Sequence, residues 1–107
     1  MSLTKNEYLQ PVEINGPFTV DGLGDVYIRE VPYADAAFVY EAKEGDRFDT
    51  SLRMVVVSVC DDGGQLVFTP DDYKALRNVP ASRLQKIMEL VTKHSGFGDD
   101  VEEVAGN

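Results

Sequence analysis

One segment of the chain, residues 52–60 ("LRMVVVSVC"), is apolar almost throughout. Such a segment is stable only when it is buried, so the rest of a small fold has to be arranged around it. Five of its side chains recur at helical spacing and would form one stripe: Leu52, Val55, Val56, Val59 and Cys60. Its four valines instead favour a strand. The residues alone leave both structures open, and we favour a buried helix.

The length and composition of the chain set the scale of the fold. Its 107 residues fit one small domain, and a hydrophobic content of 43% is ordinary for a globular protein. The sequence has no apolar run long enough to cross a membrane and begins without an apolar signal-peptide core, so we expect a cytoplasmic protein. A single cysteine excludes an internal disulfide framework.

The charge of the chain is unevenly distributed. Of the net charge of −9, residues 98–107 carry −4, from four acidic side chains and no basic one. Residues 73–94 carry +4, from five basic side chains and one acidic one. An acidic chain without a dominant basic face is a poor nucleic-acid binder, and its charge favours solubility. We expect residues 98–107 to form a disordered acidic tail outside a single domain of residues 1–97.

The first half of the chain has clear local patterns. Thr4 and Glu7 have the spacing of a capping box, which predicts a short helix. Over residues 12–31, apolar and polar side chains alternate on both sides of a glycine-rich turn. This pattern predicts an antiparallel hairpin or a meander. Residues 33–44 favour a helix that ends at Gly45.

Aspartates and glycines gather in the stretch "CDDGGQLVFTPDDYKAL", residues 60–76. A calcium loop needs a glycine at position 6 and a closing glutamate at position 12. Either Gly63 or Gly64 could occupy position 6, but neither choice places a glutamate at position 12. The stretch is better explained as a turn, a short strand over residues 65–68 and a helix start. At that start Thr69 would be the N-cap, Pro70 would occupy N1 and Asp72 would occupy N3.

The last amphipathic segment begins at Pro80. Its apolar side chains recur at helical spacing: Leu84, Ile87, Met88 and Val91. Basic side chains and Gly96 then mark a helix C-terminus. Together the elements predict an α+β fold, a small single domain in which an N-terminal β-hairpin or meander packs with three to four helices.

The sequence contains no convincing catalytic or metal-binding constellation. His94 and Cys60 are the only histidine and the only cysteine. We expect a surface histidine that complements the helix dipole and a buried apolar cysteine, not a nucleophilic pair. Two such side chains are too few for a zinc site. Asp71 and Asp72 are interpreted as capping groups and not as an acid–base pair. We therefore expect no cofactor, no metal and no enzymatic activity, which leaves an interaction protein.

Two segments of the chain resemble the tail assembly chaperones of long-tailed, siphovirus-type bacteriophages. Residues 22–31 ("GLGDVYIREV") are similar to the family's glycine turn and the following strand, which ends in Arg-Glu. Residues 55–97 are similar to the family's order of an apolar helix, an Asp-rich glycine turn, a strand ending in Phe, an Asp-rich helix start and a final amphipathic helix. The two segments cover about half of the chain, and their order and spacing carry the resemblance.

The resemblance implies an α+β fold and a helix for residues 52–60. It implies the short form of a non-catalytic chaperone that acts in the cytoplasm of the infected host cell and is not part of the mature virion. The implied partners are the tape-measure protein, which the chaperone keeps soluble, and the tail-tube protein, whose assembly it promotes. A longer form of the chaperone, made by a programmed −1 frameshift, is a further implied partner, and a homo-oligomer is compatible with this function.

A holder of a partly apolar partner needs an apolar groove, which we expect beside the last helix. Leu84, Met88 and Val91 are candidates for that groove or for the core, and Met88 is the best candidate for exposure. Lys86 and Lys93 lie together beside the apolar stripe and are candidates for a charged rim. An alternative function is a small acidic nucleic-acid mimic or inhibitor, which would need regularly spaced carboxylates over one face.

Overall fold

The structure is a computed structural model and describes residues 2–97. The elements in this part of the chain are α1 (Lys5–Tyr8), β1 (Ile14–Val20), β2 (Gly24–Arg29), α2 (Tyr33–Tyr40), α3 (Arg47–Ser58), β3 (Val59–Cys60), the 3₁₀ helix η1 (Pro70–Asn78) and α4 (Ala81–His94). A three-stranded antiparallel sheet with packed helices confirms the predicted α+β class. The predicted acidic tail, residues 98–107, lies outside the described residues.

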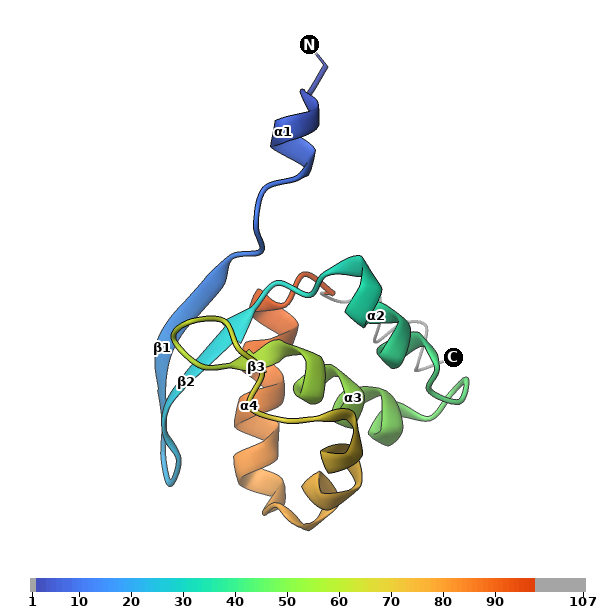
Figure 1. The fold of residues 1–107 in the computed structure, drawn as a ribbon. Helices are drawn as coiled ribbons and strands as arrows, with labels where there is room; N and C mark the ends of the chain where they lie inside the picture. The colour runs from blue at the N-terminus through green and yellow to red at the C-terminus, as the bar shows by residue number, and fades with distance from the viewer. Residues whose placement is uncertain (1, 98–107) are drawn as a thin grey trace.

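The predicted hairpin is formed by β1 and β2, which pair antiparallel on either side of a turn at Asp21–Leu23. Gly22 has a φ of 86°, a left-handed conformation that glycine adopts without strain. The strand order is β1-β2-β3, so β1 lies at one edge of the sheet (Figure 1). Val20 and Val26 turn their side chains into the core, as the alternation of the sequence indicates.

The apolar segment of residues 52–60 is a helix for most of its length and a strand at its end. Helix α3 extends to Ser58, and β3 follows without a break and pairs with β2. The prediction of a buried helix is therefore confirmed up to Ser58 and is wrong for Val59 and Cys60. Val59 pairs with Ile28, and Cys60 pairs with Tyr27. These two residues therefore pair with β2 and do not continue the helix.

Helix α3 is the centre of the fold. It packs against α2, η1 and α4, while α4 also covers β1 and β2 (Figure 1). The largest fully buried apolar side chains come from β2, α2, α3 and α4: Ile28, Val39, Met54, Val55, Val56 and Val91. Because α3 is enclosed on nearly all sides, its apolar residues are not confined to one stripe, which explains why their periodicity was ambiguous.

A buried arginine in β2 joins the sheet to the helices. The Nε of Arg29 donates a hydrogen bond of 2.8 Å to the carbonyl oxygen of Val57 in α3. Its Nη2 forms an ion pair of 2.6 Å with Asp35 in α2. A buried guanidinium is tolerated only when its donors are matched, and here the partners come from two different helices.

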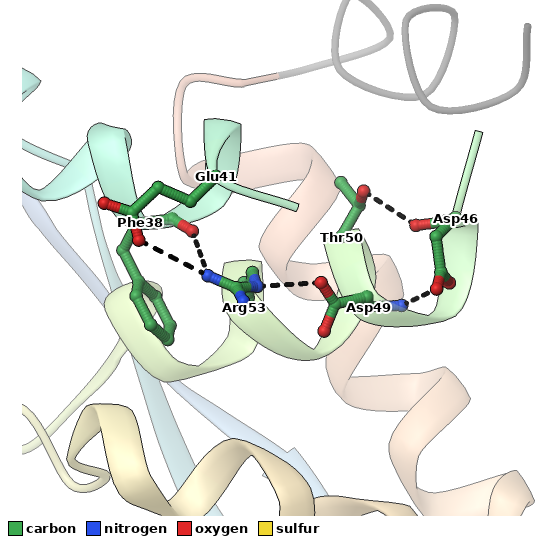
Figure 2. Close-up of polar contacts among 6 residues, drawn as sticks. All are labelled: Phe38, Glu41, Asp46, Asp49, Thr50 and Arg53. Carbon is green, nitrogen blue, oxygen red and sulfur yellow. Dashed lines mark hydrogen bonds and ion pairs between the residues drawn. The ribbon is translucent and has the colours of Figure 1, made fainter. Parts of the chain in front are cut away.

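A second arginine, Arg53, joins α3 to α2 and η1. Its Nε lies 2.9 Å from the carboxylate of Asp49, and both side chains are largely buried, at 13% and 12% exposed. Its Nη1 donates a 2.9 Å hydrogen bond to the carbonyl oxygen of Phe38 and lies 3.7 Å from the carboxylate of Glu41 (Figure 2). The guanidinium carbon lies 4.6 Å from the ring centre of Phe38 and 4.9 Å from that of Tyr73. These contacts hold three helices together through one side chain.

The start of α3 places Asp49 for this ion pair. The carboxylate of Asp46, the N-cap residue, accepts a 2.9 Å hydrogen bond from the backbone N–H of Asp49. The hydroxyl of Thr50 donates to the backbone carbonyl of Asp46 (Figure 2). An N-cap of this kind fixes where the helix begins and therefore the direction of the Asp49 side chain.

The loop before η1 differs from its prediction. Residues 65–68 do not form the expected strand, because only one bridge joins Leu66 to Cys60. The carboxylate of Asp61 instead accepts hydrogen bonds from the backbone N–H groups of Gly63 and Gln65, each at 2.9 Å. This tight loop returns the chain to β3, whose two residues are too few for a longer ladder.

The predicted helix starts and stops in the last third of the chain are confirmed. The carboxylate of Asp72 accepts hydrogen bonds from the backbone N–H and the hydroxyl of Thr69, at 2.7 and 3.1 Å. The helix that follows Thr69 is of the 3₁₀ type. Helix α4 ends at His94, and Gly96, at a φ of 94°, occupies the predicted C′ position.

Candidate functional site

An open hollow lies between β1 and α4. Residues 17–20 form one wall and the residues between Gln85 and Lys93 form the other. The apolar side chains that line the hollow come from both elements: Pro17, Phe18, Val20, Met88 and Leu90. Three charged side chains also line it: Lys86, Glu89 and Lys93. We call this hollow the β1–α4 groove. It is an apolar surface with charges along its α4 side, a composition that suits a protein partner.

The walls of the groove are held in place by the core beneath them. Ile87 and Val91 of α4 are buried and fix that helix against the sheet and α3. Phe18 of β1 stacks on the ring of His94, with ring centres 4.6 Å apart and planes inclined by 20°. His94 lies in the last turn of α4, as predicted, but its ring is half-buried by this contact and is not a surface group.

The structure separates the five predicted contact residues into two groups. Lys86, Met88 and Lys93 line the β1–α4 groove. Val91 has no exposed surface and belongs to the core. Leu84 is half-buried against the core and does not line the groove. The apolar stripe of α4 is therefore divided, with its inner residues in the core and Met88 at the edge of the groove.

The wall that β1 contributes was missed in the sequence. Phe18 and Val20 lie within the hairpin or meander predicted for residues 12–31, but no local pattern indicates which helix a strand will face. The alternation of apolar side chains at residues 18 and 20 was the available signal. It predicts one apolar face for β1, and only the tertiary packing of α4 makes part of that face a wall of a groove.

The two lysines of the groove have few partners. The Nζ of Lys86 lies 3.6 Å from the carboxylate of Asp21 in the hairpin turn, and the two side chains are 52% and 92% exposed. An exposed pair of this length contributes little, about 0–1 kcal/mol, so it does not prevent Lys86 from contacting a partner. Lys93 is also exposed. It lies two helical turns after Lys86 and therefore on the same face of α4.

Cys60 lies in the core and not in the groove. It is 3% exposed, and burial raises the pKa of its thiol, although the nearby Arg29 charge opposes that rise. A buried thiol with a raised pKa is a poor nucleophile, because the reactive form is the thiolate. Its position agrees with the prediction of a buried apolar cysteine. Across residues 2–97, we find no group of three or more His, Cys, Asp or Glu side chains that could hold a metal ion.

None of the helices formed by residues 2–97 combines the length and the apolar character that crossing a membrane requires. Comparison with known proteins gives no relative: no protein-family model matches the chain, and neither a curated protein nor a solved structure matches it.

Proposed function

We propose that the protein is a tail assembly chaperone of a long-tailed bacteriophage, which holds apolar helical segments of the tape-measure protein in the β1–α4 groove. The observation that carries the proposal is the groove itself, where Phe18, Met88 and Leu90 lie beside Lys86 and Lys93. The resemblance of residues 22–31 and 55–97 to this family provides the identity of the partner.

The size and openness of the groove support a polypeptide partner. Its volume of about 1260 Å³ exceeds the roughly 300–1000 Å³ that is usual for small-molecule sites. It lies open to solvent along α4, whereas a small-molecule site encloses most of its ligand. An amphipathic helix could lay its apolar face across such a surface.

The distribution of charge supports the same function. The chain carries a net charge of −9, yet the exposed lysines Lys86 and Lys93 lie on the groove. Lysines at the rim would attract acidic side chains that flank the apolar stripe of a partner helix. The acidic remainder would keep the complex dispersed, because a large net charge opposes aggregation.

The proposal includes the family's other expected properties. The protein would act without catalysis in the cytoplasm of the infected host cell and would not enter the mature virion. It would also contact the tail-tube protein and a longer form of itself made by a −1 frameshift. The nucleotide sequence of the gene and of its neighbours tests the frameshift and the gene order directly.

The alternative of a nucleic-acid mimic has less support from the geometry. A mimic needs carboxylates that are free to replace phosphates over one face. Asp46, Asp61 and Asp72 instead accept hydrogen bonds from nearby backbone N–H groups. These three carboxylates cap helices and close a loop.

The test is co-expression with the tape-measure protein, whose gene the proposal expects beside this one. Wild-type protein should move the tape measure from the insoluble to the soluble fraction. The double reversal Lys86→Glu and Lys93→Glu should weaken this rescue, and most strongly at low salt, because exposed charges are screened as salt rises. Met88→Asp should abolish it, because the apolar anchor of the groove is lost.

The matched control is the double reversal Lys74→Glu and Arg77→Glu on η1. It changes the net charge by the same amount at exposed positions outside the groove. It should leave the rescue intact. Circular dichroism of each variant shows whether it is folded. A tape measure that stays insoluble with the wild-type protein, or equal losses from the two double reversals, would contradict the proposal.

A further inference from the structure

A short arm, residues 2–11, stands away from the body of the protein (Figure 1). Every residue in it is exposed, including three large apolar side chains: Leu3 at 56%, Tyr8 at 72% and Leu9 at 68%. An apolar segment of this kind is costly to leave in water, because each of these side chains gains free energy when it is buried.

The arm is nevertheless organised. Thr4 and Glu7 form a capping box around α1: the backbone N–H and hydroxyl of Thr4 each donate to the Glu7 carboxylate at 3.0 Å. An isolated helix as short as Lys5–Tyr8 is not stable by itself in water. The capping box favours this helix but does not make it stable alone, so burial of its exposed apolar neighbours against a partner would complete its stabilisation.

The arm points away from the groove of its own chain. Glu13 and Glu30 tie the base of the arm to the sheet: the Glu30 N–H donates to the Glu13 carbonyl oxygen at 2.8 Å, and the Glu13 N–H donates to the Glu30 carboxylate at 2.7 Å. The base therefore lies at the end of β1 that is remote from the hairpin turn, whereas the groove uses residues 17–20, next to that turn. Figure 1 shows the arm continuing away from the turn.

We propose that the arm of one copy docks into the β1–α4 groove of a second copy, which forms an arm-exchanged assembly of this chain. The groove presents Phe18, Met88 and Leu90, and the arm would cover them with Tyr8 and Leu9. Four helical residues at about 1.5 Å each and six extended residues at about 3.3 Å each give the arm a length of about 26 Å, and a 14-residue helix such as α4 is about 21 Å long. The arm can therefore lie along α4 of a neighbour.

The docking uses side chains and not an added strand. β1 is an edge strand, but Pro17 has no N–H to offer a new neighbour, and the pairing of β1 with β2 is irregular between Asn15 and Phe18. Both features make it harder for another strand to pair with β1. An assembly that extended the sheet through β1 would need the hydrogen bonds that these residues lack.

The inference concerns the same groove as the proposed function but does not depend on the tape measure, which would displace the arm. The first measurement is the mass of the wild-type protein by light scattering over a concentration series. It should rise above the 11.8 kDa of one chain to twice that value. The double substitution Leu3→Asp and Leu9→Asp should weaken association by about tenfold or more. The control Phe48→Asp, at an exposed apolar position on α3, should not.

A mixing experiment tests the exchange itself. The double variant Leu3→Asp and Leu9→Asp, called the arm variant, has an intact groove. The groove variant Met88→Glu has an intact arm. Each alone should be monomeric, while an equal mixture should form heterodimers through the one intact arm and the one intact groove. At protein concentrations low enough for the wild type to be monomeric, the thermal melting of the arm variant should match that of the wild type, because the arm is exposed in the single chain.

A measurement on the wild-type chain covers the case in which Met88→Glu does not fold. In a mixture of labelled and unlabelled protein, isotope-filtered NMR should detect contacts between Leu9 of one chain and the Met88 methyl of another. A wild-type protein that stays monomeric, an arm variant that associates normally, or contacts found only within one chain would each overturn the inference. Rescue of the tape measure is measured separately, so either proposal can fail alone.

Discussion

The region around α3 and the region around the β1–α4 groove use charged residues in opposite ways. Around α3, Arg53 and Arg29 are buried or nearly so, and their partners lie on α2, α3 and η1. Along the groove, Lys86 and Lys93 are exposed, and the Lys86–Asp21 pair is 3.6 Å long and open to water. The first arrangement holds helices together, and the second leaves the charges exposed to solvent.

The apolar residues show the same difference. Met54 of α3 is 1% exposed and packed on all sides, while Met88 of α4 is half-buried at the edge of the groove. One side of this small fold therefore contributes stability, and the other keeps an apolar surface open at some cost in free energy. The predictions below test that division, from the largest expected effect to the smallest.

Arg53→Ala should be the most destabilising change, lowering the free energy of unfolding by about 3–5 kcal/mol. It leaves the Asp49 carboxylate, which is 12% exposed, without its closest cation and removes the contacts with both aromatic rings. Urea denaturation followed by circular dichroism measures the loss.

The control for this prediction is Arg47→Ala, at an exposed arginine on the first turn of the same helix. It should change the free energy of unfolding by no more than about 0.5 kcal/mol. Similar losses from the two variants would mean that Arg53 contributes no more than a surface charge.

The two methionines should respond differently to truncation. Met54→Ala should cost about 2–5 kcal/mol, because it leaves a cavity in the core. Met88→Ala should cost about 1 kcal/mol or less, because the site is already open. Equal losses in urea denaturation would show that the groove is part of the core and not a separate surface.

The start of η1 should contribute a smaller amount. Asp72→Ala removes the acceptor of two hydrogen bonds from Thr69 and should cost about 1 kcal/mol. Thr69→Ala should cost less, because the backbone N–H of residue 69 can still donate to Asp72. Asp71→Ala, at the exposed neighbouring position, is the control and should be nearly neutral. If Thr69→Ala abolished tape-measure binding without changing stability, this segment would be a contact site.

The smallest effect should be the pH dependence due to Cys60. Burial raises the pKa of its thiol in the folded protein, so the folded state keeps this proton at a pH where the unfolded state has lost it. Stability is therefore unaffected by Cys60 below the unfolded pKa of about 8.5 and falls as the pH rises from there through the folded pKa. Between those pH values, the wild type should lose more stability than Cys60→Ala. Parallel stability curves for the two proteins would contradict this.

The features that the sequence predicted correctly are governed by neighbouring residues. Thr4 with Glu7, and Thr69 with Asp72, are capping pairs three residues apart, so their hydrogen bonds depend on little else. The hairpin turn around Gly22 is equally local. The strand expected over residues 65–68 was wrong, because a strand exists only with a partner, and β3 offers too short an edge.

The features that the sequence did not predict depend on contacts between distant segments. Arg53 interrupts the apolar segment, and a single cation there indicates a buried partner, but nothing in the sequence identifies Phe38 or Tyr73 as that partner. The β1 wall of the groove is a similar case, because Phe18 meets α4 only in the folded chain. Candidate residues on α4 could be named in advance, whereas the shape of the site could not.

The chain contains three methionines, Met1, Met54 and Met88, which makes one measurement decisive. Methyl-labelled methionine gives a signal from the core at Met54 and a signal from the groove at Met88. When a soluble apolar helix of the tape-measure protein is added, the Met88 signal should shift with increasing concentration while the Met54 signal stays in place. An unchanged Met88 signal, at helix concentrations where the helix is seen to bind, would contradict the assignment of the β1–α4 groove as the partner site.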